Sequence, residues 1–257
     1  MPEDAYRAEL VISFYRVRQA LGVMGLLLPV LLIIGGWMSL GGVEPSISDY
    51  YHTVLRDVFV GVMTAIAMFL IAYPGHQRQA GEYVSDDRLT TIAGIAALGV
   101  AFFPNENRFR LEVLQSPAQQ ILGHKYAAIG HYTCAILFLT LLAVLCLRKF
   151  SRSAKPARRR IYRTCGWTIL LMTIGVIVAS YFKINGPVGP QAFVNDYMIV
   201  LWLEAVAVWA FAIAWLTKGR ADLALARVAR KPLPRVRRLT RTEPPASAGG
   251  PSGSDPA

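Results

Sequence analysis

Six long apolar runs constrain this chain more than any other feature of its sequence. They lie at 20–40, 57–74, 89–104, 127–147, 164–182 and 197–217. A helix needs roughly 17–25 apolar residues to cross the hydrocarbon core of a bilayer. Lipid offers the backbone no hydrogen-bond partners, so each run is expected to be helical. The sequence therefore predicts an all-α polytopic membrane protein with six transmembrane helices at 19–218.

The composition agrees with a membrane protein. Of the 257 residues, 54% are hydrophobic and only 17% are charged, which is too apolar for an ordinary soluble domain. Residues 1–18 predict a cytoplasmic amphipathic segment on the inner leaflet. Residues 219–257 start basic and become rich in Pro, Ala, Gly and Ser, which predicts a disordered cytoplasmic tail.

The basic residues predict the orientation of the bundle. The link between the fourth and fifth runs has no acidic residue, and the tail after the sixth run is also strongly basic. By the positive-inside rule both segments are cytoplasmic, and six spans place the N-terminus on the same side. We expect a multi-pass protein of a bacterial cytoplasmic (inner) membrane, with anionic lipid headgroups at the basic loop and tail. Nucleic acid is not an expected partner, because no aromatic residues interleave with the basic charge.

Local signals predict where several helices begin. Ser46 or Ser48 is a candidate N-cap for a second helix that continues into the 57–74 run. Ser116 followed by Pro117 is the expected start of the fourth helix, which then carries two histidines into the membrane. The third run is rich in Ala and Gly, a composition that allows neighbouring helices to approach closely.

Polar side chains gather toward the extracytoplasmic half of the predicted bundle. On the predicted second helix, the i, i+3, i+7 spacing of Asp49, His52 and Arg56 places them on one face. His124 and His131 share a face of the fourth helix, and Glu204 lies about two turns inside the sixth. A carboxylate at that depth costs about 2.5–3.5 kcal/mol and faces a partner or a cavity. These six residues either line an outward cavity or form structural caps, ion pairs and hydrogen bonds. The sequence leaves both interpretations open and assigns no catalytic residue.

Histidines on the predicted second and fourth helices also suggest a metal site. His52, His124 and His131, with Asp49 or Glu204, would supply three nitrogen ligands and a carboxylate to a divalent metal such as zinc. In residue types this set resembles intramembrane hydrolases of the alkaline ceramidase and adiponectin-receptor type. That similarity extends to residue types only, since those proteins have seven spans and this chain has no HxxxH pair.

A second resemblance rests on Ser46–His52, on Arg56–Gly61, and on Glu204 with Val208–Phe211 and Trp215–Gly219. Over about residues 20–219 the chain resembles uncharacterised bacterial six-span membrane proteins with a domain of unknown function. The resemblance implies six helices in a bacterial cytoplasmic membrane and brings no activity with it. The first hypothesis for function is therefore binding or permeation of a small molecule or ion. The alternatives are a metal-dependent lipid hydrolase and a non-catalytic scaffold or accessory subunit.

Overall fold

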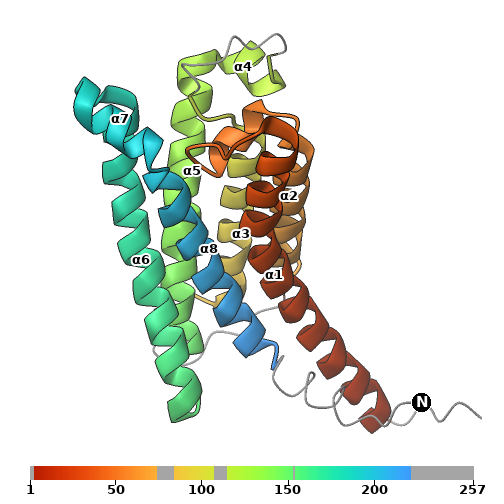
Figure 1. Cartoon of the computed structure of the whole chain (residues 1–257). Coiled ribbons are helices and arrows are strands. Elements are labelled where there is room, and N and C mark those ends of the chain that lie inside the picture. Colours follow the sequence, from red (N-terminus) through yellow and green to blue (C-terminus); the bar gives the residue numbers. More distant parts are fainter. Residues whose placement is uncertain (1–2, 74–83, 107–114, 153, 221–257) are drawn as a thin grey trace, which may run out of the picture. The chain divides into compact units, whose positions relative to one another are not determined.

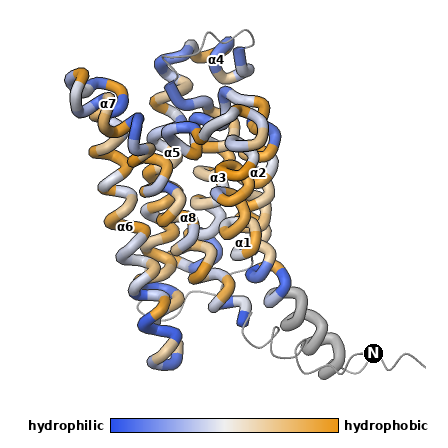
Figure 2. Tube along the Cα trace, viewed as in Figure 1, coloured by the Kyte–Doolittle hydropathy of each residue, from blue (hydrophilic) through white to orange (hydrophobic). Residues whose placement is uncertain are grey.

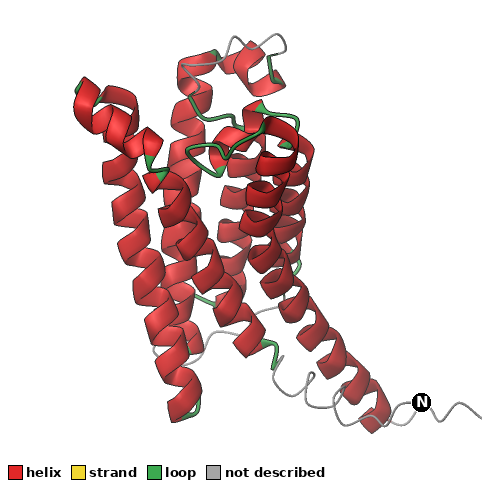
Figure 3. Ribbon diagram, viewed as in Figure 1, coloured by secondary structure: helices red, strands yellow, loops and turns green. Residues whose placement is uncertain are grey.

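The computed structural model describes residues 3–73, 84–106, 115–152 and 154–220, with side chains from Tyr15 onward. These residues form helices and no strand (Figure 3). The all-α prediction is confirmed for this part of the chain. Residues 74–83, 107–114 and 221–257, which include His76 and most of the predicted tail, lie outside the described residues.

The helices follow the predicted apolar runs closely. In chain order they are α1 (Glu3–Leu40), η1 (Ser48–His52), α2 (Arg56–Ile71), α3 (Asp86–Phe102), α4 (Pro117–Leu122), α5 (His124–Val144), η2 (Leu145–Phe150), α6 (Pro156–Asn185), α7 (Val188–Asp196) and α8 (Ile199–Lys218).

Four helical segments are long and apolar enough to cross a membrane. They are Tyr15–Leu40, His124–Phe150, Pro156–Asn185 and Ile199–Lys218. They correspond to the first, fourth, fifth and sixth predicted spans. The second and third predicted spans are also helical, but α2 has 16 residues and α3 has 17. At about 1.5 Å per residue, helices of that length rise about 24–26 Å. The chain is therefore a membrane protein with at least four helices of spanning length.

The predicted start of the second helix is wrong. Ser48 opens the short 3₁₀ helix η1 instead, and the chain is extended at Thr53 before α2 begins at Arg56. The Thr53 hydroxyl donates to the carbonyl of Tyr50 and accepts from the backbone N–H of Leu55, which closes the turn between the two helices. Asp49 and His52 are consequently not on one helix with Arg56, and the i, i+3, i+7 argument does not apply.

The fourth predicted helix is broken near its start. Ser116 caps α4 through a capping box with Gln119, with Pro117 at the first helical position, as predicted. Gly123 then takes a φ of +80°, a conformation that favours glycine, and α5 begins at His124. The break turns α4 away from α5 at one end of the bundle (Figure 1).

Small residues bring α3 close to its neighbours, as the composition predicted. A Cβ on Gly94 would lie 2.7 Å from the carbonyl oxygen of Ala67 in α2. A Cβ on Gly99 would overlap the Sγ of Cys134 in α5. The helix α3 is therefore packed tightly between α2 and α5.

Polar residues concentrate at the two ends of the bundle. Figure 2 shows apolar residues along the middle of the helices and hydrophilic residues where α6 begins and around α4. The segment containing η1 lies at the same end as α4 and α7, opposite the link between α5 and α6 (Figure 1). The link between α6 and α7 is short, because α6 ends at Asn185 and α7 already begins at Val188.

Candidate functional site

A cavity of about 910 Å³ lies between α5 and α6 at the end of the bundle that carries η1. Its lining is polar in one part and apolar in another. The polar side chains include Ser48, His131 and Glu204, whereas Ile136, Leu139 and Ile177 belong to an apolar part. Pockets for small molecules usually have volumes of about 300–1,000 Å³, and most have an apolar wall with a few convergent polar groups. This cavity has both properties.

Glu204 holds the segment before η1 against α8. Its Oε2 accepts a 2.6 Å hydrogen bond from the backbone N–H of Ile47. The backbone N–H of Leu201, in the first turn of α8, donates to the carbonyl of Pro45 at 2.9 Å. This second bond satisfies one of the N–H groups that a helix start leaves without a partner. The two bonds fix the backbone of 45–47 beside the cavity.

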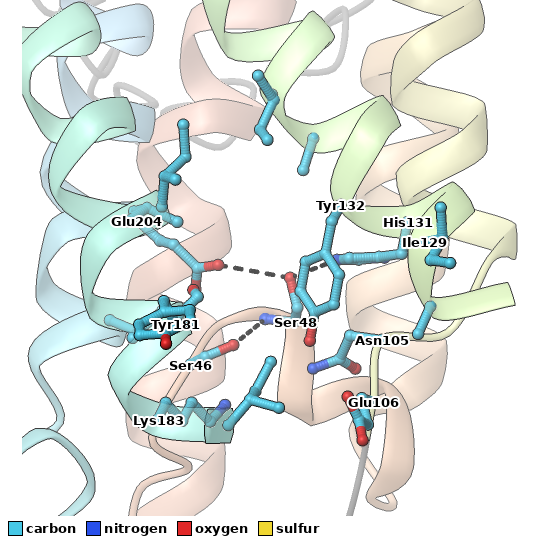
Figure 4. A pocket seen from close by; sticks show the side chains of 18 of the residues that line it. Ser46, Ser48, Asn105, Glu106, Ile129, His131, Tyr132, Tyr181, Lys183 and Glu204 are labelled. Atoms are coloured by element: carbon cyan, nitrogen blue, oxygen red, sulfur yellow. Dashed lines mark hydrogen bonds between the residues drawn. The ribbon is translucent and has the colours of Figure 1, made fainter. Parts of the chain in front are cut away.

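Ser48 lies between Glu204 and His131 (Figure 4). Its Oγ is 2.9 Å from Nε2 of His131 and 3.5 Å from Oε1 of Glu204. The other ring nitrogen of His131, Nδ1, is 2.7 Å from the carbonyl oxygen of Phe103. His131 and Ser48 are only 1% and 7% exposed, so both are buried and still border the cavity.

A second polar chain begins at Lys183 on α6. Its ammonium forms an ion pair with Oδ2 of Asp49. The amide nitrogen of Asn105 donates to Oδ1 of the same carboxylate at 2.6 Å. The amide oxygen of Asn105 is 2.9 Å from Nε2 of His52. Both carboxylate oxygens of Asp49 thus have donors, and its charge is balanced by Lys183.

The remaining predicted site residues have other neighbours. His124 lines the cavity, with its two ring nitrogens 3.2 Å from the side chains of Gln115 and Gln119. The Arg56 guanidinium stacks over the Tyr51 ring, 4.2 Å from its centroid, and does not line the cavity. The structure thus brings Asp49, His131 and Glu204 together around η1 and separates Arg56 from them.

The three histidines of the predicted metal site each have different hydrogen-bond partners. Among the described residues, no group of three or more His, Cys, Asp or Glu side chains is arranged to hold a metal ion. His131 in particular has both ring nitrogens in hydrogen bonds, to Phe103 and Ser48. Zinc binding by the three histidines therefore stays a prediction from the sequence.

Comparison with protein-family models, with curated proteins and with solved structures finds no significant match to this chain. The resemblance to bacterial six-span proteins accordingly stays a prediction.

Sequence reasoning misses the roles of Ser48, Lys183 and Asn105. The sequence pattern favours a helix cap for Ser48 and an interfacial anchor for Lys183, beside Tyr181 and Phe182. The available signal is charge: Asp49 and Lys183 are opposite charges that the predicted topology places at the same membrane depth. Nothing in the spacing indicates a role for Asn105, which is 56 residues from Asp49 along the chain.

Proposed function

We propose that this protein is a six-span protein of a bacterial cytoplasmic membrane that binds a small amphiphilic molecule in an outward-facing cavity. The single observation that carries the binding proposal is the cavity between α5 and α6, which combines a polar end with an apolar remainder. A ligand with a polar head and a hydrocarbon tail matches both parts. The head would contact Ser48, His131 and Glu204, and the tail would lie against Leu139 and Ile177.

The apolar part of the cavity opens between the two helices. Ile129 and Ile136 on α5 and Ile177 on α6 all line the cavity, and they are 49%, 40% and 44% exposed. Exposed isoleucines that line the cavity on both helices favour an opening on this side of the bundle. Lipid hydrocarbon surrounds that side in a membrane, so an amphiphile has a route to the cavity.

The six spans and their orientation rest on helix packing and charge. The helices α2 and α3 are short, but they pack against α1 and α5, which are long enough to cross the membrane. The basic link after α5 favours a cytoplasmic location, where anionic headgroups attract it. This orientation makes the cavity extracytoplasmic.

The binding proposal is tested with a dansyl-labelled alkyl glycerol ether and protein in lipid nanodiscs. Wild type is expected to bind the probe saturably. Ile177→Trp adds bulk inside the cavity and is expected to weaken binding by about tenfold, equivalent to about 1.4 kcal/mol. Ile174→Trp is the matched control, since Ile174 is an exposed residue on the same helix that does not line the cavity. Equal binding by the two variants, or no saturable binding by wild type, contradicts the proposal.

A further inference from the structure

The hydrogen bonds around His131 determine which group holds the proton that it shares with Ser48. The carbonyl oxygen of Phe103 can only accept, so Nδ1 of His131 must carry a hydrogen and donate it. Before any substrate binds, an imidazolium here would be a buried charge whose hydrogen-bond partners are a carbonyl and a hydroxyl, which is unfavourable. The neutral ring with hydrogen on Nδ1 has an acceptor at Nε2. The hydroxyl of Ser48 therefore donates to Nε2 across 2.9 Å.

Glu204 does not compete effectively for the same hydroxyl proton. Its Oε1 is 3.5 Å from Oγ of Ser48, at the outer limit of a hydrogen bond, whereas Nε2 of His131 is 0.6 Å closer. Glu204 instead accepts from the Ile47 N–H, and Ser46 Oγ accepts from the backbone N–H of Ser48. These contacts fix the backbone on both sides of the hydroxyl.

We propose that Ser48 and His131 are a nucleophile and general base that cleave a carboxylic ester of an amphiphile bound in the cavity. The proposal rests on the amphiphile-binding function above and adds a reaction to it. A serine bonded to a histidine, with the second ring nitrogen held by a third group, is the arrangement that activates a hydroxyl as a nucleophile. Here the third group is the carbonyl of Phe103. The pair borders the polar end of the cavity, where the ester of a lipid-like molecule would lie next to its head.

The reaction balances with water as the co-reactant. Oγ of Ser48 bonds to the ester carbonyl carbon while Nε2 of His131 takes the hydroxyl proton. The carbon–oxygen bond to the alcohol breaks, and Nε2 returns the proton to the departing alkoxide. Water then attacks the acyl-serine, its proton passes through Nε2 to Oγ of Ser48, and a carboxylic acid leaves. Throughout, Nδ1–H keeps its bond to Phe103, which holds the ring in position.

We assign two cavity residues as hydrogen-bond donors to the negative oxygen that forms in each step. Lys183 and Asn105 line the same cavity, and each donates to Asp49. An ammonium has three N–H groups and an amide has two, so both retain further donors. Donors directed at that oxygen would stabilise the developing oxyanion.

Long-chain alkyl fluorophosphonates test the pair directly, because an activated serine displaces fluoride and forms a stable bond to phosphorus. In wild-type protein in nanodiscs, peptide mass spectrometry is expected to locate the adduct at Ser48. Ser48→Ala should abolish that adduct. His131→Gln keeps an N–H for the Phe103 carbonyl but removes the base, so labelling should slow by about 10²-fold or more. Ser39→Ala, an exposed serine on α1, is the control and should label at the wild-type rate.

The outcomes separate this proposal from the binding proposal. If the glycerol ether binds in the cavity but neither a long-chain nor a diisopropyl fluorophosphonate modifies Ser48, the reaction is wrong and binding stands. If diisopropyl fluorophosphonate labels Ser48 while the ether shows no saturable binding, the pair is reactive and the amphiphile site is wrong. An adduct at another residue, or His131→Gln labelling at the wild-type rate, also contradicts the pair.

Discussion

Asp49 and Lys183 show how the site depends on single residues far apart in the chain. The two are 134 positions apart, and their ion pair joins η1 to the end of α6. Both side chains are nearly buried, at 12% and 11% exposure. Removing one partner of a buried ion pair leaves the other charge without compensation, which usually costs about 3–5 kcal/mol.

Lys183→Met is therefore expected to destabilise the protein by about 3 kcal/mol, because the carboxylate of Asp49 stays buried. The double variant Lys183→Met with Asp49→Asn removes both charges and should recover a large part of that loss. Thermal unfolding in the same detergent compares the stability of wild type, the Lys183→Met variant and the double variant. A double variant no more stable than Lys183→Met would mean that the ion pair is not the source of the effect.

At the scale of single residues, the sequence predicts only part of the site. Asp49, His131 and Glu204 stand out because charged and imidazole groups are costly in or near hydrocarbon. Ser48 does not, since a hydroxyl is inexpensive there and is as frequent in caps as in sites. The contacts of Ser48 and Lys183 join segments separated by 83 and 134 residues, and local spacing contains no information about such pairs.

At the scale of elements, glycine positions decide how the helices pack. Gly94 lies where α3 crosses α2, and any side chain there meets the backbone of Ala67 and Ile71. Gly61, in α2, faces open space, and a Cβ added there would have no atom within 4 Å. The same substitution therefore has opposite consequences at the two positions.

Gly94→Ala is expected to lower the melting temperature, because the backbone of α2 cannot move away without disturbing α1. Gly61→Ala is the matched control and should be neutral or stabilising by about 0.5–1 kcal/mol, the helix propensity difference. Melting temperatures of the two purified variants provide the comparison. A stable Gly94→Ala protein would contradict the close approach of α2 and α3.

The sequence predicts most of the helices, but it predicts the breaks between them less well. Apolar runs locate every long helix, and Ser116 with Pro117 correctly marks the start of α4. The 3₁₀ turn at Ser48–His52 escapes prediction because Ser46 and Ser48 also suit a helix start. The break at Gly123 escapes it because a glycine between two helical segments is compatible with a continuous helix until its φ is known.

At the scale of the whole molecule, the proposed orientation places the two ends of the bundle on opposite sides of the membrane. Val188, which begins α7, is 84% exposed at the end that carries the cavity. Lys155 is exposed in the basic link at the opposite end. Each position therefore reports on one side of the membrane.

In a variant without its three native cysteines, Val188→Cys should react with a membrane-impermeant maleimide on intact cells. Lys155→Cys should react only after the cells are permeabilised. The extent of labelling of each variant is measured by the gel shift that a maleimide-linked polymer causes when it reacts with the remaining free cysteine. Labelling of Lys155→Cys alone on intact cells would reverse the orientation and make the cavity cytoplasmic.

The side opening proposed between α5 and α6 has a consequence for how occupancy of the cavity would be controlled. A ligand that enters between these helices comes from the lipid bilayer. Its mole fraction in one leaflet, rather than its aqueous concentration, therefore sets the fraction of cavities that are occupied. Partitioning already concentrates long-chain amphiphiles there, by about 0.8 kcal/mol for each buried CH₂. The cavity can therefore be well occupied even if its own contacts favour the ligand only weakly over neighbouring lipid.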